Sequence, residues 1–470
     1  MNLSKLLYSA IFVVLLLPFN GTDLFAQRLP EYVQLARSNK QEPASFDQII
    51  LPGDTDSTVT LATVFNMPYS YLSFKKNNSG PSGKEFYSAI QLNMEVFKSN
   101  KSKLGKRKDV SVEGLPSVGR TMWSDTAFAA DYQQSQSTDK FVSGYVKTSL
   151  TPGVYSYVLQ MKQGQETESR RSRAKTLSIS RYNTIEVGNV ILGENFIEGQ
   201  ELSQLVLSRF GKNVKYATDF YALVYLPDFN TESNYSLTVT NLNIQDKDTS
   251  KAKSVYSKKL AKKHINKGIK PSLVATNNER VRVDLQQVSD GYTYALIKIP
   301  GTKLPNAVYR LTVDTQSSTK PVAQTVFQTV WPDIPNSLLS LDVAVDMLRF
   351  IADDKTINRL SSGTKKEREQ KFRDYWKKRD PSPKTEFNEL MTEYYNRIDY
   401  AFEKYSSKQK LGYNTDQGKV YIKYGPPNDI ERKFPTKGAT TEIWSYPSRE
   451  FIFKATSGFG DFRLVEQTRK

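Results

Sequence analysis

The spacing of apolar residues changes near the segment Trp331–Pro335 of this 470-residue chain, and the change separates two kinds of structure. Before the segment Trp331–Pro335, apolar and polar residues alternate in short runs, a pattern typical of strands with one buried face. After that segment, apolar residues recur every three or four positions, which is typical of helices. We therefore expect a β-rich N-terminal part and a C-terminal part that begins with helices.

The alternating runs in the N-terminal part lie between turn-forming pairs such as Pro52-Gly53, at a spacing typical of β-sandwiches. The clearest runs are Val59–Phe65, Ala89–Phe97, Val154–Leu159, Phe220–Tyr225, Tyr235–Val239, Val281–Leu285 and Tyr294–Ile299. We predict two tandem immunoglobulin-like β-sandwich domains, although a single larger β domain would give much the same pattern.

A weak internal repeat links the two predicted sandwiches. Leu150–Tyr155 reads Leu-Thr-Pro-Gly-Val-Tyr, and Leu304–Tyr309 reads Leu-Pro-Asn-Ala-Val-Tyr, each just before a strand pattern. Both resemble the turn followed by a tyrosine that opens a late strand of an immunoglobulin-like sandwich. The repeat therefore favours two domains of the same type.

The C-terminal part begins with three predicted helices. The first covers Leu341–Ile351 with Ser337 as its cap, and Thr364 with Glu367 forms a capping box for the second. The third follows Thr385 and carries apolar residues as far as Tyr405. Asp380–Pro383 is a non-helical elbow, because its two prolines restrict the backbone. We expect a helical cluster followed by a small antiparallel sheet, α+β in class.

The first 26 residues predict the compartment. Lys5 is followed by the apolar segment Leu6–Phe19, and Ala26 offers a small residue at a cleavage point, which is typical of a cleaved secretory signal. The alternative is an N-terminal anchor helix. We expect an exported protein, periplasmic or associated with the cell envelope. The predicted domains are 1–26 (signal peptide), 27–195 and 196–333 (sandwiches), and 334–470 (helices and α+β domain).

Composition removes several classes of active site. The chain has no cysteine and a single histidine, His264, which lies among lysines that disfavour its protonated form. We therefore expect no catalytic residues, no cofactor and no metal site. The formal net charge of +17 predicts attraction to anionic partners, but export argues against nucleic acid. Basic residues gather at Lys98–Lys108, Arg170–Lys175 and Lys251–Lys270, which we expect to be loop tips, either simply solvated or attracted to anionic envelope polymers and membrane surfaces.

The most patterned segment of the chain is Gly412–Pro427. Thr415 to Gly418 has turn chemistry, with Asp416 as a turn former and Gly418 free to adopt positive φ. Lys419–Tyr424 then alternates polar and apolar residues, which predicts a half-buried strand, and two prolines end it.

This segment, Gly-Tyr-Asn-Thr-Asp-Gln-Gly at its start, resembles the signature of the GWxTD domain, a module of exported bacterial proteins with no assigned biochemical role. The resemblance extends upstream through Trp376, Tyr394 and Arg397, and downstream through Trp444–Tyr446 and Gly458–Leu464. The family's tryptophan is Tyr413 here. We expect the signature to form a binding loop with an exposed cluster around Tyr413 and Tyr421. Its residues are Gly412, Tyr413, Thr415, Asp416, Gly418, Lys419, Tyr421 and Tyr424.

Acidic residues offer one alternative chemistry, since glycoside hydrolysis needs only two carboxyl groups. Asp416 is the best single acid, and Glu386, Glu389 and Glu393 share one predicted helix face that we expect to be solvated. Asp353-Asp354 is expected at a helix end and not as a ligand pair. Gly80–Lys84 lacks the spacing of a phosphate loop and predicts a hairpin.

Taken together, these observations favour a non-catalytic envelope protein that binds a protein or glycan partner, an anionic one among the candidates, with peripheral membrane association as a further expectation. One alternative is a carbohydrate-active enzyme that uses Asp416. Another is a subunit of a secretion or outer-membrane assembly machine. The oligomeric state is left open.

Overall fold

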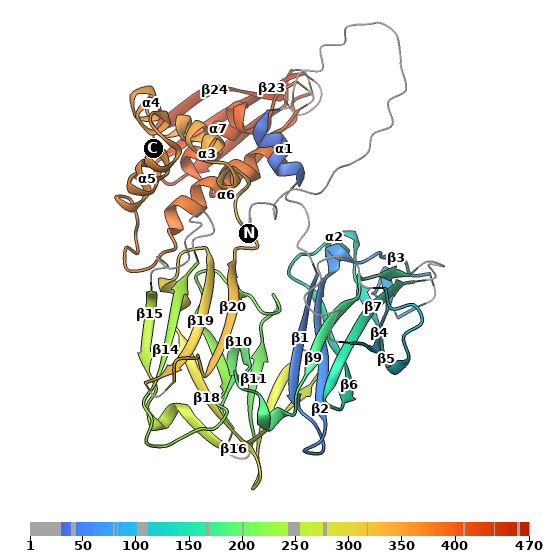
Figure 1. Cartoon of the computed structure of the whole chain (residues 1–470). Coiled ribbons are helices and arrows are strands. Elements are labelled where there is room, and N and C mark those ends of the chain that lie inside the picture. The colour runs from blue at the N-terminus through green and yellow to red at the C-terminus, as the bar shows by residue number, and fades with distance from the viewer. Residues whose placement is uncertain are drawn as a thin grey trace, which may run out of the picture.

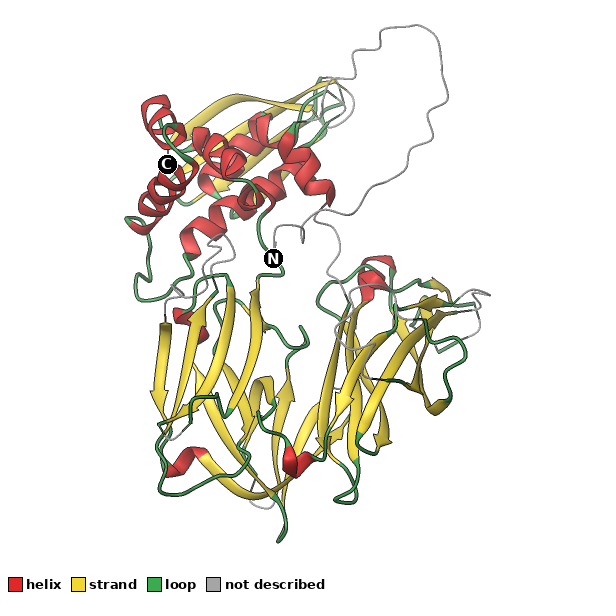
Figure 2. Cartoon of the chain, in the orientation of Figure 1, coloured by secondary structure: helices red, strands yellow, loops and turns green. Residues whose placement is uncertain are grey.

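The computed structural model describes residues 30–38, 44–78, 80–81, 83–100, 111–164, 169–199, 202–242, 254–275, 280–316, 318–407, 409–436, 438–457 and 461–469. The predicted signal peptide lies outside these residues. Figures 1 and 2 show two β-rich regions side by side, with the helices and a further small sheet above one of them. Among the described residues, no helix combines the length and the hydropathy that a membrane span requires.

The first β region packs a three-stranded antiparallel sheet against a larger one. The smaller sheet has the order β1 (Ser45–Pro52), β2 (Val59–Pro68) and β6 (Phe141–Leu150). The larger contains β3 (Lys75–Lys76), β4 (Phe86–Lys98), β5 (Ser117–Ala129), β7 (Gly153–Gln163), β8 (Arg170–Arg171) and β9 (Lys175–Ile179). Phe65 and Trp123 meet edge to face between them, with ring centroids 4.7 Å apart. Lys76 pairs with Phe86, which confirms the hairpin predicted around Gly80–Lys84.

The second β region contains a closed barrel and a five-stranded sheet. The barrel has the order β10 (Val190–Ile197), β11 (Leu202–Leu207), β17 (Arg282–Gln287), β16 (Ile265–Val274), β18 (Tyr292–Ile299) and β13 (Phe220–Tyr225). The sheet has the order β12 (Val214–Lys215), β20 (Ala323–Val330), β19 (Val308–Thr315), β14 (Tyr235–Asn241) and β15 (Ser254–Lys259). The alternating runs singled out in the sequence lie in strands of the two β regions, except that Val281 directly precedes β17. The expected boundary at 195/196 falls within β10, so the strands of this region begin earlier than that boundary.

The chain is mainly β, with several antiparallel sheets and a C-terminal helical region, as the change in periodicity predicts. One core cluster runs from β2 and β4 of the first region through Tyr182 into the barrel, where it includes Leu205 and Tyr294. A second cluster lies between the barrel and the five-stranded sheet. Because apolar burial is continuous across their junction, the two β regions are packed against each other and are not independent modules on a linker.

The internal repeat has the same geometry at both positions. The Tyr155 hydroxyl donates to the Thr151 carbonyl at 2.9 Å, and the Tyr309 hydroxyl donates to the Pro305 carbonyl at 2.5 Å. Each bond reaches back four residues across the turn. The structure therefore confirms that the two segments are equivalent turn-and-tyrosine entries, into β7 and β19.

The helical region contains α3 (Leu341–Met347), α4 (Asp354–Ser361), α5 (Lys365–Lys377), α6 (Glu389–Tyr405) and α7 (Asp416–Tyr424). The Thr364–Glu367 capping box is confirmed. One predicted cap is wrong, because Ser340 and not Ser337 caps α3. Asn388 caps α6. Several residues near each helix start have side chains that can accept a hydrogen bond, and tertiary packing selects one of them. Asp353 caps α4, where its carboxylate accepts a hydrogen bond from the Thr356 amide at 2.9 Å.

The predicted strand Lys419–Tyr424 is wrong, because these residues belong to helix α7. Thr415 caps this helix by accepting a hydrogen bond from the Gly418 amide at 3.0 Å, so the expected turn is the first turn of a helix. Gly425 ends the helix with φ of 80°. A six-residue alternation is compatible with a strand or with two turns of helix, and the cap and the final glycine determine which one forms.

A four-stranded antiparallel sheet closes the chain, in the order β21 (Asp429–Lys433), β22 (Thr441–Tyr446), β23 (Arg449–Ser457) and β24 (Asp461–Arg469). The small antiparallel sheet expected after the helices is confirmed, with Trp444–Tyr446 in β22, whereas β21 was not predicted. Val420 of α7 packs on one face of this sheet against Trp444, Phe451 and Phe453.

Helix α1 (Glu31–Ser38) lies far from its sequence neighbours. It packs into the C-terminal helical core, where Tyr32, Val33 and Ala36 are buried (Figure 1). The Tyr32 hydroxyl donates to Asp399 Oδ1 at 2.7 Å, a contact that joins residues 367 positions apart. The first described helix therefore shares one core with residues 343–422.

Candidate binding surface

The glycines of the signature allow three helical segments to pack closely. A Cβ atom on Gly412 would lie 1.9 Å from the Ala401 carbonyl oxygen of α6, and one on Gly418 would lie 1.9 Å from the Gly412 carbonyl oxygen. Gly418 does not adopt the positive φ that was expected of it. Its requirement for glycine is steric, because α7 crosses the Gly412–Asn414 turn with no room for a side chain.

Tyr413 is buried, with only 3% of its surface exposed, so the expectation that it forms part of an exposed cluster is wrong. Its ring meets the Tyr32 ring edge to face at 5.1 Å and stacks near Phe402 at 6.1 Å. The Arg349 guanidinium lies 5.7 Å from its ring centroid. The pKa of Tyr413 is raised, chiefly by burial. Tyr413 is therefore a core residue that links α1 to the signature.

Asp416 forms a connection within the domain. It is the first residue of α7, and its Oδ2 accepts a hydrogen bond from the Leu464 amide of β24 at 3.0 Å. A carboxylate at a helix N-terminus is also favoured by the helix dipole. Asp416 joins the start of α7 to the sheet and is not a turn former.

A buried carboxylate that the sequence did not single out lies behind the signature. Glu442 of β22 is 2% exposed, and it accepts hydrogen bonds from Gln417 Nε2 at 2.7 Å and from Trp444 Nε1 at 3.1 Å. Arg432 supplies the counter-charge, with its Nε 2.5 Å from Glu442 Oε1. Three donors satisfy this carboxylate, as a buried charge requires. Its partners lie on three different elements, which is why no local motif reveals it.

The remaining signature residues lie on the outer side of α7. Lys419 is exposed, whereas Tyr421 and Tyr424 are half-buried. The Tyr421 ring stacks on Tyr400 of α6, with centroids 4.5 Å apart and planes 17° apart. Burial raises the pKa of Tyr421, with Tyr400 and Glu393 adding to the effect and Arg397 opposing it.

These rings continue into a mixed aromatic and basic surface. Arg397 Nε donates to Glu393 Oε1 at 2.8 Å, and its guanidinium lies beside Gly425, where an added Cβ would be 3.0 Å from Nη2. The Arg449 guanidinium lies 4.6 Å from the ring centroid of Tyr424. We call this set the tyrosine–arginine surface; it consists of Arg397, Tyr400, Tyr421, Tyr424 and Arg449.

The other acidic candidates are held apart. Glu389 accepts a hydrogen bond from the Ser382 hydroxyl, and Glu393 pairs with Arg397. Glu386 precedes α6, where its carbonyl oxygen accepts a hydrogen bond from the Tyr216 hydroxyl at 2.9 Å. The prediction that the three glutamates share one helix face is therefore wrong, because Glu386 lies before the first residue of α6. In the described part of the chain, no group of three His, Asp or Glu side chains could hold a metal ion.

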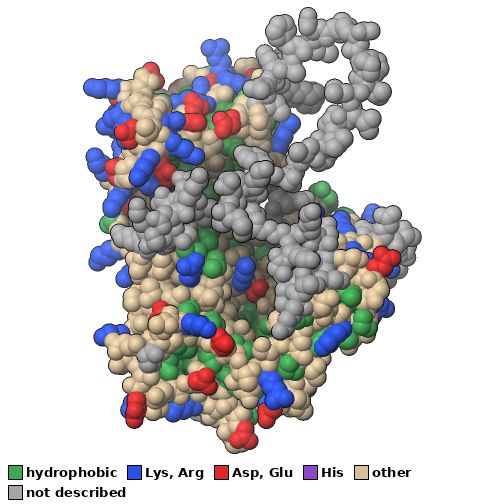
Figure 3. Space-filling model, in the orientation of Figure 1, with side chains coloured by type: hydrophobic (Ala, Val, Ile, Leu, Met, Phe, Trp, Pro, Cys, Tyr) green, Lys and Arg blue, Asp and Glu red, His purple; other side chains and the backbone are tan. Residues whose placement is uncertain are grey.

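The basic clusters are not all loop tips. Arg170 and Arg171 form β8, and most of the third cluster lies in β15 and β16, whereas residues 101–110 of the first cluster lie outside the described residues. His264 ends a short 3-10 turn, and its pKa is lowered by burial, with Lys258 and Lys263 contributing. Figure 3 shows Lys and Arg side chains scattered over the visible face among acidic ones.

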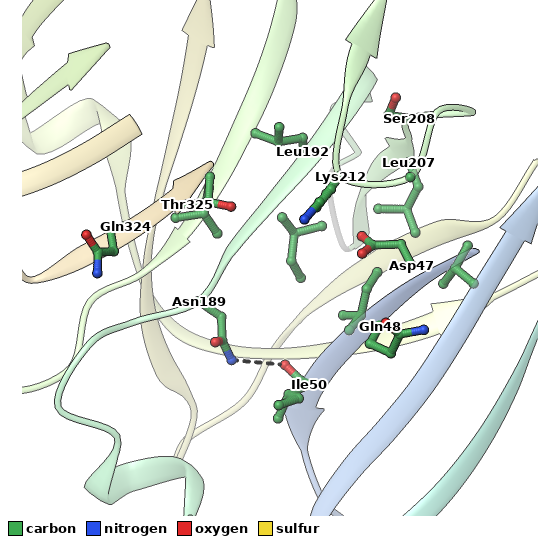
Figure 4. Close-up of a pocket in the computed structure, with 15 residues that line it drawn as sticks. Asp47, Gln48, Ile50, Asn189, Leu192, Leu207, Ser208, Lys212, Gln324 and Thr325 are labelled. Carbon is green, nitrogen blue, oxygen red and sulfur yellow. Dashed lines mark hydrogen bonds between the residues drawn. The ribbon is translucent and has the colours of Figure 1, made fainter. Parts of the chain in front are cut away.

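A cavity of about 220 Å³ lies where the two β regions meet. Asp47 of β1 and Lys212 point toward each other across it, and Asn189 Nδ2 donates to the Ile50 carbonyl at 3.4 Å (Figure 4). Burial raises the pKa of Asp47 to about 6, although Lys212 opposes this effect. The cavity is formed by segments distant in sequence, so sequence reasoning missed it.

Asp47 gives a prediction about stability and pH. Its folded-state pKa of about 6 lies above its ordinary value of 3.8. The contribution of this difference to the free energy of unfolding is therefore complete below pH 3.8 and is lost as pH rises through 6. Asp47→Asn removes the ionisation and should stabilise the protein by up to about 3 kcal/mol at pH 7.5, but by close to zero at pH 3.5. Urea unfolding at both pH values measures this difference. Equal differences at the two pH values would contradict it.

Comparison with known proteins gives one family. The model of the GWxTD domain matches residues 307–464, from the start of the β19–β20 hairpin to β24. No curated protein matches the chain.

Among solved structures, the C-terminal domain of the Streptococcus pyogenes antigen I/II-family protein AspA is 9% identical, covering 61% of this chain and 99% of that one, with a TM-score of 0.15. The C-terminal domain of the Streptococcus agalactiae AgI/II polypeptide BspA is 12% identical, covering 61% and 100%, with a TM-score of 0.14. Purple acid phosphatase PPD1 from yellow lupin (Lupinus luteus) seeds is 10% identical, covering 62% and 42%, with a TM-score of 0.14. At these TM-scores, the likenesses support no inference about fold or function.

Proposed function

Since this chain is a GWxTD domain-containing protein, with the domain matched at residues 307–464, we propose that it is a non-catalytic binding or scaffold protein of the cell envelope. Its partner is a protein or a glycan, and the tyrosine–arginine surface is where it binds. In this proposal the buried signature residues build the domain, and the outer residues of α6 and α7 contact the partner.

The stacked pair Tyr400–Tyr421 beside Arg397 carries the proposal. Tyr400 is 40% exposed, and the α6–α7 packing that Gly412 and Gly418 permit holds its ring against Tyr421. Tyrosine and arginine are enriched among the residues that dominate binding energy at interfaces. Rigid aromatic rings also lose little conformational entropy when a partner covers them. The buried glycines of the signature therefore fix the positions of the residues that form the tyrosine–arginine surface.

The finer parts of the proposal concern fold and location. We propose that the two β regions are immunoglobulin-like sandwiches, supported by the matching bonds of Tyr155 and Tyr309 to carbonyls four residues upstream. We also propose that residues 1–26 direct export, supported by Lys5 and the apolar segment Leu6–Phe19.

The test is capture of a partner from native envelope extracts by crosslinking to the purified protein. Tyr400→Ala is expected to reduce capture at least about tenfold, which corresponds to a loss of about 1.4 kcal/mol of binding free energy. The matched control is Tyr132→Ala, which removes a 67% exposed tyrosine from the first β region. Equal capture by both variants would reject this surface.

The same material tests the alternatives. In our proposal Asp416 positions β24 through the Leu464 amide, so Asp416→Asn should lower the melting temperature. Turnover of a glycan that is abolished by this variant, at an unchanged melting temperature, would support an enzyme instead. Stoichiometric co-purification with several envelope proteins would support a subunit of an assembly machine.

A further inference from the structure

We propose that the outer edge of β21 is a homodimer interface, at which a second copy of this chain extends the C-terminal sheet. β21 is the last strand at one end of the four-stranded sheet. An edge strand presents backbone N–H and C=O groups that can pair with another strand. Its residues Asp429–Lys433 are all exposed.

The hydrogen-bonding direction of β21 follows from its neighbours. The Ala455 amide donates to the Thr440 carbonyl at 2.9 Å, and the same register pairs Trp444 with Phe451. Because bonded and non-bonded pairs alternate along antiparallel strands, the backbone groups of Trp444 point toward β23 and those of Ile443 toward β21. Glu431, which pairs with Ile443, then points its backbone toward β22. Ile430 and Arg432 consequently point their N–H and C=O groups outward.

The same stretch carries exposed apolar side chains. Ile430 is 46% exposed, and Phe434, one residue after the strand, is 74% exposed. Phe434 is the most exposed of the large hydrophobic side chains in the described part of the chain. Ile430 pairs with Trp444 in the sheet and therefore lies on the face that α7 covers. Alternation places Phe434 on that face too. Ile430 and Phe434 are therefore two exposed apolar side chains at this edge, beyond the part of the face that α7 covers.

One two-fold register pairs all of these groups. With the axis at Arg432, Ile430 lies opposite Phe434 of the second copy, and Glu431 lies opposite Lys433 of the second copy. The outward backbone groups of Ile430 and Arg432 then pair with those of Phe434 and Arg432, which matches the alternation described above.

Charge is consistent with the same register. The dimer contains two Glu431–Lys433 pairs of opposite sign, one on each side of the axis, and cross-strand pairs of this kind are favourable. The two Arg432 side chains meet at the axis, but each is already paired with the buried Glu442 of its own copy. The charged residues that would block a generic edge are thus complementary to their own two-fold image.

Charge reversal tests this interface in the full mature chain. Sedimentation velocity over a concentration series should show a monomer–dimer equilibrium. Glu431→Lys alone and Lys433→Glu alone each put like charges opposite one another and should each weaken dimerisation at least about tenfold. Both side chains are exposed and on the uncovered face, so the melting temperature should stay within a few degrees of that of the unchanged chain.

The decisive measurement mixes the two single variants. In a Glu431→Lys and Lys433→Glu heterodimer every cross-axis pair is again of opposite sign, so mixing should restore the dimer. The double variant should restore it by itself. Phe434→Ser should weaken the dimer in every background. A chain that stays monomeric at all concentrations, or single variants that dimerise as well as the unchanged chain, would overturn the proposal.

Discussion

Replacing Gly412 by alanine is expected to destabilise the C-terminal domain by about 3 kcal/mol or more, the largest effect of any single methyl group in the signature. The new Cβ would lie 1.9 Å from the Ala401 carbonyl oxygen and 2.7 Å from the Ser406 amide nitrogen. Both are backbone atoms, so the contact can be relieved only by moving α6 away from the turn. That movement would also break the bond from the Gly412 amide to Ser406 Oγ, which is 2.8 Å long.

Chemical denaturation followed by tryptophan fluorescence measures the effect, because Trp444 and Trp376 lie in the cores of this domain. Gly418→Ala should behave in the same way, since its Cβ would meet the Gly412 carbonyl oxygen. Lys419→Ala is the control, an exposed position on the same helix that should change stability by less than about 0.5 kcal/mol. A Gly412→Ala variant as stable as this control would contradict the close contact between Gly412 and the backbone of α6.

The second large effect is expected at the other end of the chain. Tyr32→Ala should cost about 3 kcal/mol or more, because it removes a 2% exposed ring from the C-terminal core and leaves a cavity beside Phe402 and Tyr413. The loss should appear in the C-terminal domain although the substitution lies in a helix that precedes the first β region. Hydrogen exchange of α6 before and after the change measures this directly.

Tyr32→Phe separates the hydrogen bond from the packing. It keeps the ring and removes only the donor to Asp399, whose other carboxylate oxygen accepts the Asn336 amide at 2.9 Å. The expected cost is about 1.5 kcal/mol, as for a hydrogen bond to a charged group. Burial raises the pKa of Asp399, which means that its ionised form is less favourable in the folded protein than in water. If Tyr32→Ala left α6 exchange unchanged, α1 would not belong to this core.

Local patterns predicted local structure well. The Thr364–Glu367 capping box involves two residues one helical turn apart, so nothing distant could change the outcome. The alternating β runs were equally reliable, because they recur between turn-forming residues at the spacing of consecutive strands. Lys419–Tyr424 was not: over six residues its alternation also fits a helix, and the Thr415 side chain can start either a turn or a helix.

The site depends on contacts that no local pattern encodes. Whether Tyr413 faces solvent or core depends on Tyr32, 381 positions away in the printed sequence, and a tyrosine is compatible with both. Glu442 appears in the sequence as an ordinary strand glutamate, and only the fold brings Gln417, Trp444 and Arg432 to it. The sequence could indicate that the signature matters, but not that most of its residues act from inside the domain.

The position of α1 has a mechanical consequence. A protease that cut the Trp331–Pro335 connection would separate the polypeptide into two pieces, yet α1 belongs by sequence to the first piece and by packing to the second. The pieces should co-migrate on a native column and separate only on a denaturing gel. The packing of α1 thus closes the chain into a loop by non-covalent contacts. A force applied between the β regions and the C-terminal domain would therefore be carried by two connections and not by one.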